Sequence, residues 1–520
     1  MIKHQRVKPE FYNFCQEYVK DRKNKVFYIF FVLLFTIYLI PLFLVRIPPL
    51  VDYPNHLARM HLLINIDNSS FLQEYYKVQW AVLPNLAMDI IVPLFAQVMP
   101  LDWAGKCFIA LIFFLLSSGT TALHYVVHRQ LSFWSLLAFL FIYNNLFLWG
   151  FLNFLFGIGL CLWIFAGWIY FEKQSAWIRI ILFSILSIFL FFSHLFSLGI
   201  YGLCILGYEI YRLYENYYQQ SFKYNIYNRF IAFIQFLPSA FLLIFLSPTV
   251  SNSESHKIIF GDFSRKIDAL LGPVNNYFYK LDVLTILLIF FLFSIAVFTR
   301  KIKIPKNSII LLCIIISSFF FMPAILLSAH NVDERIPIVF PFLLIAVSQF
   351  KSKITNWTII IFFILISAAG IRHGILIYHW IKADNVYSQY IDAFQKMNKG
   401  TKLISAIGHS KKGWCPFPAP VIHIPCLSII ESSAFVPSLF AYPTQQPITF
   451  TKSYKNIAKQ TKTPFQIGSN LSTDWYKLTN DYDYLLVVNE HYFDNKIPTE
   501  FKKIYCGSNF QFLKVKKTNE

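Results

Sequence analysis

Apolar runs of membrane length recur along this chain, and they constrain its fold more than any other feature. A bilayer core requires about 20 consecutive apolar residues from a helix. Runs near that length cover residues 26–45, 106–127, 152–171, 230–247, 283–298 and 308–327, and tighter pairs cover 133–149, 177–192, 195–211, 336–347 and 354–371. With 56% hydrophobic and only 14% charged residues, one water-soluble core is excluded. The sequence predicts an α-helical polytopic membrane protein with about eleven transmembrane helices.

Basic residues around the first run predict its orientation. Lys20, Arg22, Lys23 and Lys25 precede it, and positive charge favours the cytoplasmic side. The run is too long for a cleaved signal peptide. We therefore expect a cytoplasmic segment 1–25, a transmembrane domain 26–382 with a first outer loop 46–104, and a carboxyl-terminal region 383–520 outside the cytoplasm.

The carboxyl-terminal region is less apolar and predicts a water-facing α/β domain. Residues 401–407, 484–488 and 510–515 resemble strands, and 386–397 resembles a helix. Among Cys415, Cys426 and Cys506 one disulfide is possible in an oxidising compartment.

The net charge of +19 does not require a nucleic-acid partner. Most basic residues fall in the short loops expected in the cytoplasm, where topology and anionic lipid account for them. We expect membrane lipid and no nucleic acid among the partners.

The segment VDYPNHLAR, residues 51–59, follows the first run and gathers three candidate catalytic residues, Asp52, His56 and Arg59. Pro54 suits a first helical turn, so a helix is expected to begin near Tyr53. Asp52 would then lie at the positive end of that helix, which favours a carboxylate able to act as a general base. Alternatively, Asp52 only caps the helix.

A second short apolar element, residues 86–98, carries Asp89. A lone acid there is costly, so Asp89 is either a second catalytic acid or the buried partner of Arg59 or Lys106. Asp52, Asp89, His56 and His61 could also supply oxygen and imidazole ligands to a divalent cation such as Mg²⁺ or Mn²⁺. Their spacing is not that of a known metal motif, so no metal ligands are assigned.

Two later outer loops carry candidates for binding a phosphate. Outer loops of membrane proteins usually contain few cations, yet one contains Lys257, Arg265 and Lys266; a solvated amphipathic loop is the alternative. The other, HNVDER, contains His330, Asp333, Glu334 and Arg335. Arg335 could bind two phosphate oxygens, or Asp333 or Glu334 could neutralise it. His194, between two predicted spans, could bind substrate or cap a turn.

This layout resembles the GT-C superfamily of integral-membrane glycosyltransferases. The resemblance lies in Asp52 of VDYPNHLAR soon after the first span, the short helices of that loop, the late Arg335 of DERIPIVFP, and the carboxyl-terminal domain. It implies a GT-C-like fold and an inverting transfer of sugar from a polyprenyl-phosphate donor to an extracytoplasmic acceptor, with Asp52 as base. The next outer loop, 144–153, lacks the second acid of many members, which leaves metal dependence open.

The resemblance also implies a multi-pass protein of the bacterial inner membrane, with the site on the extracytoplasmic face. The alternatives are a transporter or flippase, a polymerase or ligase using the same lipid-linked substrates, and a receptor that binds through its outer domain. Few acids fall inside the spans, which disfavours coupled transport.

Overall fold

The computed structural model describes residues 22–215, 229–251, 258–327, 329–351, 356–409, 420–460, 465–467, 474–493 and 496–515. Among the residues singled out above, Lys20, Lys257 and Cys415 lie outside this part, as does nearly all of segment 1–25. Cys426 and Cys506 are both free thiols.

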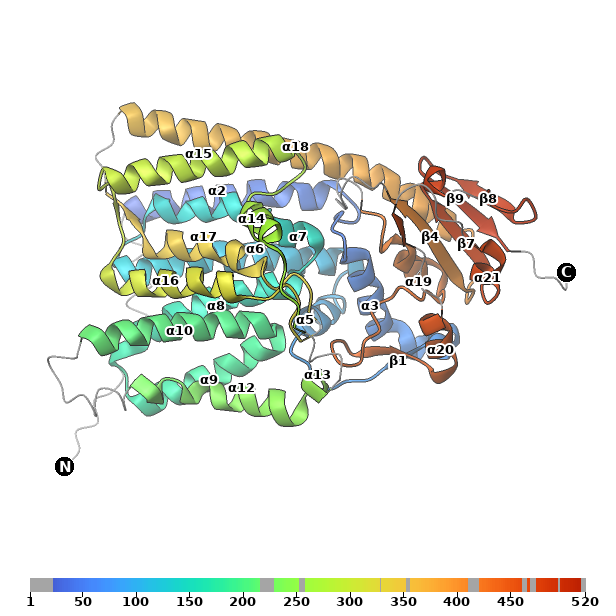
Figure 1. Cartoon of the computed structure of the whole chain (residues 1–520), viewed down its shortest axis with the longest axis horizontal. Coiled ribbons are helices and arrows are strands. Elements are labelled where there is room, and N and C mark those ends of the chain that lie inside the picture. Colours follow the sequence, from blue (N-terminus) through green and yellow to red (C-terminus); the bar gives the residue numbers. More distant parts are fainter. Residues whose placement is uncertain are drawn as a thin grey trace.

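Long helices running side by side along the molecule form a bundle, with a small sheet at one end (Figure 1). Seven helical segments of the described chain are long and apolar enough to cross a membrane. They are α2 (Arg22–Leu44), α6 (Leu101–His128), α8 (Leu152–Tyr170), α9 (Ala176–Ser193), the segment Arg229–Leu246, α15 (Tyr279–Phe298) and α18 (Asn356–Phe394). The predicted polytopic helical class is therefore confirmed.

The other four predicted spans have different forms. Helix α10 (Leu195–Glu215) is long but more polar, and α16 (Lys306–Phe321) and α17 (Arg335–Val347) are short. The run 133–149 is not one continuous helix: a 3₁₀ helix η2 (Phe133–Phe141) is followed by the short α7 (Asn145–Trp149). Residues 142–144 between them make a break that hydropathy does not reveal.

Apolar side chains face outward along the bundle. On α15, Leu284, Leu287, Phe290 and Phe291 are each more than half exposed. Contiguous apolar surface of this extent is unfavourable in water but not in lipid. The exposed faces are therefore those expected of a membrane protein.

The two ends of the bundle differ in charge. Arg300, Lys301, Lys303 and Lys351 lie around the short antiparallel pair of β2 (Ile302–Lys303) and β3 (Gln349–Phe350). This basic end is opposite the end that carries the carboxyl-terminal sheet, which we call the sheet end (Figure 1). The separation agrees with the charge pattern from which the orientation was predicted.

The carboxyl-terminal region forms a five-stranded mixed sheet in the order β6-β4-β7-β9-β8. The strands β4 (Leu403–His409), β7 (Tyr484–Val488) and β9 (Phe510–Lys514) coincide with the predicted ones. The edge strands β6 (Phe465–Ile467) and β8 (Lys502–Cys506) were not predicted, and their short or amphipathic sequences explain why. The helix expected at 386–397 is the end of α18, which continues from the bundle to the sheet (Figure 1).

The first outer loop and the carboxyl-terminal region are joined by strand pairing and hydrogen bonds. The loop contains α3 (Tyr53–Asn65), α4 (Ser70–Tyr75), β1 (Tyr76–Val78) and α5 (Ala87–Phe95). Strand β1 pairs antiparallel with β5 (Ile448–Phe450). The buried Tyr76 hydroxyl donates to the Ala434 carbonyl at 2.9 Å and accepts from the Val436 amide at 2.9 Å. The region after 383 is thus not an independent appendage, because it completes a sheet with the first loop.

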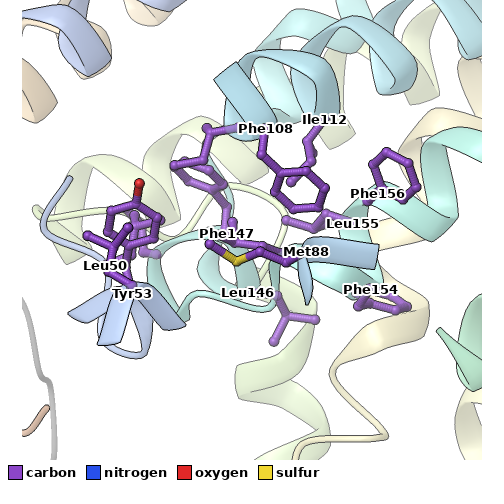
Figure 2. Close-up of a cluster of buried hydrophobic side chains, with 14 of the residues drawn as sticks. Leu50, Tyr53, Met88, Phe108, Ile112, Leu146, Phe147, Phe154, Leu155 and Phe156 are labelled. Carbon is purple, nitrogen blue, oxygen red and sulfur yellow. The ribbon is translucent and has the colours of Figure 1, made fainter. Parts of the chain in front are cut away.

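A cluster of buried apolar side chains anchors this loop to the bundle (Figure 2). Leu50 and Tyr53 of the loop and Met88 of α5 gather near Phe108 of α6 and Phe147 of α7. All five are nearly inaccessible to solvent. Burying side chains of this size contributes roughly 1.5–3 kcal/mol each, so the start of α3 has a fixed position.

Candidate active site

Asp52 immediately precedes α3, as predicted, but its side chain does not cap the helix. It makes no capping hydrogen bond. The backbone amide of Asp52 donates to the Trp149 carbonyl at 3.0 Å, so the backbone at Asp52 is held against the turn after α7. The carboxylate has 16% exposure and no capping role to satisfy it, which leaves it available for chemistry.

Gly150 is a close neighbour of Asp52 on that turn. Its φ of +95° lies in the left-handed region that favours glycine. A Cβ atom added to Gly150 would lie 3.0 Å from the Asp52 Cβ and 3.1 Å from the Asp52 amide nitrogen. Only a glycine therefore permits both this turn and this close approach.

A histidine from the carboxyl-terminal region approaches the same carboxylate. His423 Nε2 lies 3.4 Å from Asp52 Oδ1, and its side chain is 13% exposed. Among the described residues, this is the only polar contact of the Asp52 side chain, so Oδ2 has no hydrogen-bond partner there. One carboxylate oxygen is therefore directed toward His423, and the described residues leave the other without a hydrogen-bond partner.

Arg59 and Asp89 form a buried ion pair with each other. Arg59 Nε donates to Asp89 Oδ1 at 2.7 Å and Nη2 donates to Asp89 Oδ2 at 3.1 Å, and both side chains have 0% exposure. This is the alternative in which Asp89 is the buried partner of Arg59. We therefore correct the catalytic assignment of both residues: a buried pair of this geometry links α3 to α5 and leaves neither charge for substrate.

The two histidines of α3 also have hydrogen-bond partners within the protein. His56 Nε2 lies 3.2 Å from the Gly150 carbonyl, and His61 Nδ1 lies 3.2 Å from Asn65 Nδ2. Burial, with Arg59 nearby, holds the pKa of His56 well below its ordinary value, and burial lowers the pKa of His61 to about 4. The His56 backbone amide donates to the Asp52 carbonyl at 3.0 Å, but no hydrogen bond joins the two side chains, and the His56 ring supports the turn at Gly150 instead.

The possible metal ligands are not brought together. Asp89 is bound by Arg59, and His56 and His61 have the separate partners given above. Within the described residues no group of three or more His, Cys, Asp and Glu side chains could hold a metal ion.

Arg335, the first residue of α17, is buried but has no carboxylate partner. Its side chain lies among the rings of Phe151, Phe154 and Phe196, with its guanidinium carbon 5.3, 5.3 and 4.4 Å from the ring centroids. Nη2 donates to the His330 carbonyl at 3.1 Å, and Nε has no partner. In the described part of the chain Arg335 forms no ion pair within 4.0 Å.

His194, beside Arg335, has too few acceptor atoms for the N–H groups that face it. The Phe196 amide lies 3.1 Å from His194 Nδ1, and Arg335 Nη1 lies 3.0 Å from His194 Nε2. Burial first, and Arg335 second, hold the pKa of His194 well below its ordinary value, so the ring is neutral. A neutral imidazole has one N–H and one acceptor nitrogen, yet both nitrogens face N–H groups. One of these contacts is donor against donor, and an oxygen anion would relieve it.

The other predicted phosphate-binding cations are already neutralised. Arg265, on α14 (Phe263–Leu271), donates to Asp333 from Nε at 3.1 Å and to Glu334 from Nη2 at 3.0 Å. Lys266 donates to the Phe319 and Met322 carbonyls at the end of α16. We therefore remove Arg265, Lys266, Asp333 and Glu334 from the phosphate site, because their charges hold α14 against the loop before α17. His330 is exposed and contributes its carbonyl to Arg335.

One turn connects Asp52 with Arg335. Gly150 lies against Asp52, and the adjacent Phe151 presents its ring to the Arg335 guanidinium. Glu334, the residue before Arg335, accepts a hydrogen bond from Asn145 of α7 at 3.1 Å. Asp52 and Arg335 therefore both contact the turn 149–151.

Two surface hollows lie at the opposite, basic end. One, of about 440 Å³, opens between α6, α8, α10 and α16 and is lined by Arg129, Glu172, Arg212 and Lys306, among others. Arg212 is paired there with Glu172 and Glu215. Asp52 and Arg335 line neither hollow.

Sequence reasoning missed His423, Gly150 and Asn55. His423 contacts Asn55 across 368 positions of the chain, and no local pattern marks either residue. Gly150 could have been found as a glycine after α7 in a loop between predicted spans, where helices commonly end in the left-handed conformation.

No family model, curated protein or solved structure matches this chain. The class that the fold itself defines is a polytopic helical membrane protein with a carboxyl-terminal mixed sheet.

Proposed function

We propose that this protein is an inverting membrane glycosyltransferase of the GT-C type. It would move a sugar from a polyprenyl-phosphate donor to an extracytoplasmic acceptor, with Asp52 as the base and Arg335 binding the donor phosphate. One observation carries the proposal. Among the described residues, Asp52 Oδ2 has no hydrogen-bond partner and the buried Arg335 guanidinium has no carboxylate within 4.0 Å, and both residues contact the turn 149–151.

Asp52 has the properties required of a base. A general base needs an unoccupied acceptor and a fixed position. The amide hydrogen bond to Trp149 and the apolar cluster around Leu50 and Tyr53 fix its backbone, while Oδ2 is open. The acceptor hydroxyl would give its proton to Oδ2 as its oxygen attacks the anomeric carbon.

Arg335 has the properties required for holding the leaving group. Its Nε and the N–H of His194 lack good acceptors, and phosphate oxygens are the acceptors that such donors favour. In the reaction the bond between the anomeric carbon and the phosphate oxygen breaks, and the phosphate leaves with the electron pair. A guanidinium at that position stabilises the charge that develops.

The finer topology belongs to the same proposal. The seven long helices together with α10, α16, α17 and the broken segment 133–149 would give eleven crossings. The basic end would then face the cytoplasm and the sheet end the opposite side. The proposed location is a bacterial inner membrane, where polyprenyl-phosphate-linked sugars would reach Arg335 from the lipid.

The decisive test is transfer from a labelled polyprenyl-phosphate sugar by the purified full-length protein in lipid nanodiscs. A panel of sugars and acceptor lipids is scanned with the wild type and with Asp52→Asn, which keeps the side-chain shape. We expect Asp52→Asn to lower turnover at least about 100-fold, the usual contribution of a general base, and to leave donor affinity unchanged.

Asp102→Asn is the matched control, because Asp102 is an acid of the same outer region that pairs with Arg46 at the surface. It should leave turnover near that of the wild type. Equal turnover by wild type and Asp52→Asn would refute the role of Asp52. Movement of solute or lipid across proteoliposomes without any glycosidic product would favour the alternative, a transporter or flippase.

A further inference from the structure

The environment of His423 determines which of its ring nitrogens carries hydrogen. His423 Nδ1 lies 3.2 Å from the side-chain nitrogen of Asn55, and Nε2 lies 3.4 Å from Asp52 Oδ1. The tautomer of a histidine follows from the partner of each nitrogen. The orientation of the Asn55 amide therefore decides whether a donor or an acceptor nitrogen of His423 faces Asp52.

Asn55 has only one orientation that satisfies its neighbours. The Phe440 amide donates to Asn55 Oδ1 at 3.0 Å, and Asn55 Nδ2 donates to the Ser438 carbonyl at 3.0 Å. A flipped amide would place donor against donor and acceptor against acceptor at these two backbone groups. The second hydrogen of Nδ2 is thus directed at His423 Nδ1, which must be the acceptor nitrogen.

The consequence is that a neutral His423 carries its hydrogen on Nε2, facing Asp52. The Phe440 ring packs edge-on against the imidazole, with centroids 4.7 Å apart, and this restricts rotation of the ring. Asn55 itself is fully buried. The Asn55 amide therefore sets the tautomer of His423, and the N–H group of His423 faces the Asp52 carboxylate.

We propose that His423 is a positioning residue for Asp52, and that the carboxyl-terminal region thereby completes the active site of the transferase. This rests on the proposed function. The imidazole N–H holds Oδ1, so that Oδ2 faces the acceptor hydroxyl and takes its proton. His423 does not receive that proton, because Nε2 already carries hydrogen and Nδ1 is occupied by Asn55.

The distance of 3.4 Å is longer than the usual 2.7–3.2 Å of a hydrogen bond to oxygen. Contacts of catalytic groups are often long without substrate and shorten in the complex. His423 belongs to the segment before η7 (Ile424–Cys426), and Phe440 to the segment before β5. A small closing movement of these segments over α3 would shorten the contact.

The first experiment compares His423→Leu with His423→Gln in the full-length protein. The Gln side-chain nitrogen can occupy the place of Nε2 and donate to Asp52, whereas Leu cannot. We expect His423→Leu to lower kcat about 10- to 100-fold with an unchanged KM for the donor. The pH–rate profile of this variant should differ from that of the wild type, because the base loses the N–H group that positions it. His423→Gln should recover a large part of kcat.

The matched control for these variants is His61→Leu. Among the described residues the His61 ring bonds only to Asn65 of the same helix, so its replacement removes an imidazole of the same region without touching Asp52. This control should keep the wild-type kcat and pH profile.

The outcomes separate the two proposals. If the wild type and Asp52→Asn differ as expected while His423→Leu keeps the wild-type kcat and pH profile, the role of His423 is refuted and the function stands. If no variant, nor the wild type, transfers sugar, the function fails. If His423→Leu does not fold, as judged by gel filtration and circular dichroism, the tautomer of His423 decides: hydrogen on Nε2 supports the role, and hydrogen on Nδ1 contradicts it.

A second measurement does not depend on activity. Nitrogen-15 NMR of the ring-labelled protein in lipid, assigned by comparison with His423→Gln, reports which nitrogen of His423 carries hydrogen. We expect the Nε2–H form at neutral pH. A ring with its hydrogen on Nδ1 would overturn the inference, since Nε2 would then face Asp52 as an acceptor.

Discussion

Arg59 and Arg335 are both buried arginines at the sheet end of the bundle, but they have opposite surroundings. Arg59 is paired with the Asp89 carboxylate through two hydrogen bonds, and its Nη1 alone lacks a partner among the described residues. Arg335 faces a neutral imidazole, one carbonyl and three aromatic rings. A buried cation is costly unless it is compensated. The difference is that Arg59 has its countercharge in direct contact, whereas Arg335 has only the electrostatic influence of the neighbouring Glu334.

The largest expected effect comes from breaking the matched pair. Asp89→Asn leaves the Arg59 charge buried without a carboxylate, so we expect the free energy of unfolding to fall by about 3–5 kcal/mol. Chemical unfolding in detergent measures it. The double variant Arg59→Met, Asp89→Leu should recover much of the loss. A single variant within about 1 kcal/mol of the wild type would show that the pair is not a structural link.

Arg335 should respond in the opposite way. Arg335→Met removes a buried charge that pairs with no described carboxylate, so stability should change little. Affinity for a polyprenyl-phosphate donor should fall at least about tenfold, as expected for lost hydrogen bonds to a charged group. Arg335→Lys keeps the charge but not the planar fork and should also weaken binding. Donor affinity is measured by equilibrium binding in nanodiscs. An unaltered affinity in both variants would remove Arg335 from the site.

The turn between the two groups offers a smaller effect. Gly150→Ala places a Cβ against Asp52 at a φ of +95°, so we expect a loss of about 1–2 kcal/mol from the conformation alone and a lower kcat. Gly199→Ala on α10 is the control, because its Cβ would meet no atom within 4 Å and helices favour alanine. Equal stability and kcat in Gly150→Ala and the wild type would contradict the geometry of this turn.

The smallest effect is on pH dependence. The pKa of His194 is lowered in the folded protein and is about 6.5 when unfolded. Its contribution to stability is therefore complete above about pH 6.5 and is lost as pH falls, because the unfolded state binds the proton first. One unit of acidification costs about 1.4 kcal/mol at most.

Thermal unfolding at two pH values, in the wild type and in His194→Gln, measures this dependence. The variant should lose stability less steeply with acid. An anion at Arg335 should raise the pKa of His194 and reduce the slope. An identical slope in both proteins would show that His194 is not neutral beside Arg335.

The sequence predicted the parts of the site that are local. Asp52 before a helix beginning at Tyr53, and the short element around Asp89, were both located from residue type and position. The choice between possible partners could not be made in this way, although Arg59 was one of the two offered for Asp89. Asp89 pairs with Arg59 across 30 positions, and Arg265 with Asp333 across 68, and several other acids and cations were equally near in sequence. Choosing among them requires the distances that packing creates.

The sequence by itself determined that the chain forms a helical membrane bundle with a sheet near its carboxyl terminus, because hydropathy and alternation act over short windows. The tertiary structure alone decided which charges are compensated. It joined β1 to β5, placed His423 beside Asp52, and left Arg335 among aromatic rings. Such contacts depend on side chains far apart in the chain meeting in a low-dielectric interior, where the cost of burial makes each partner matter.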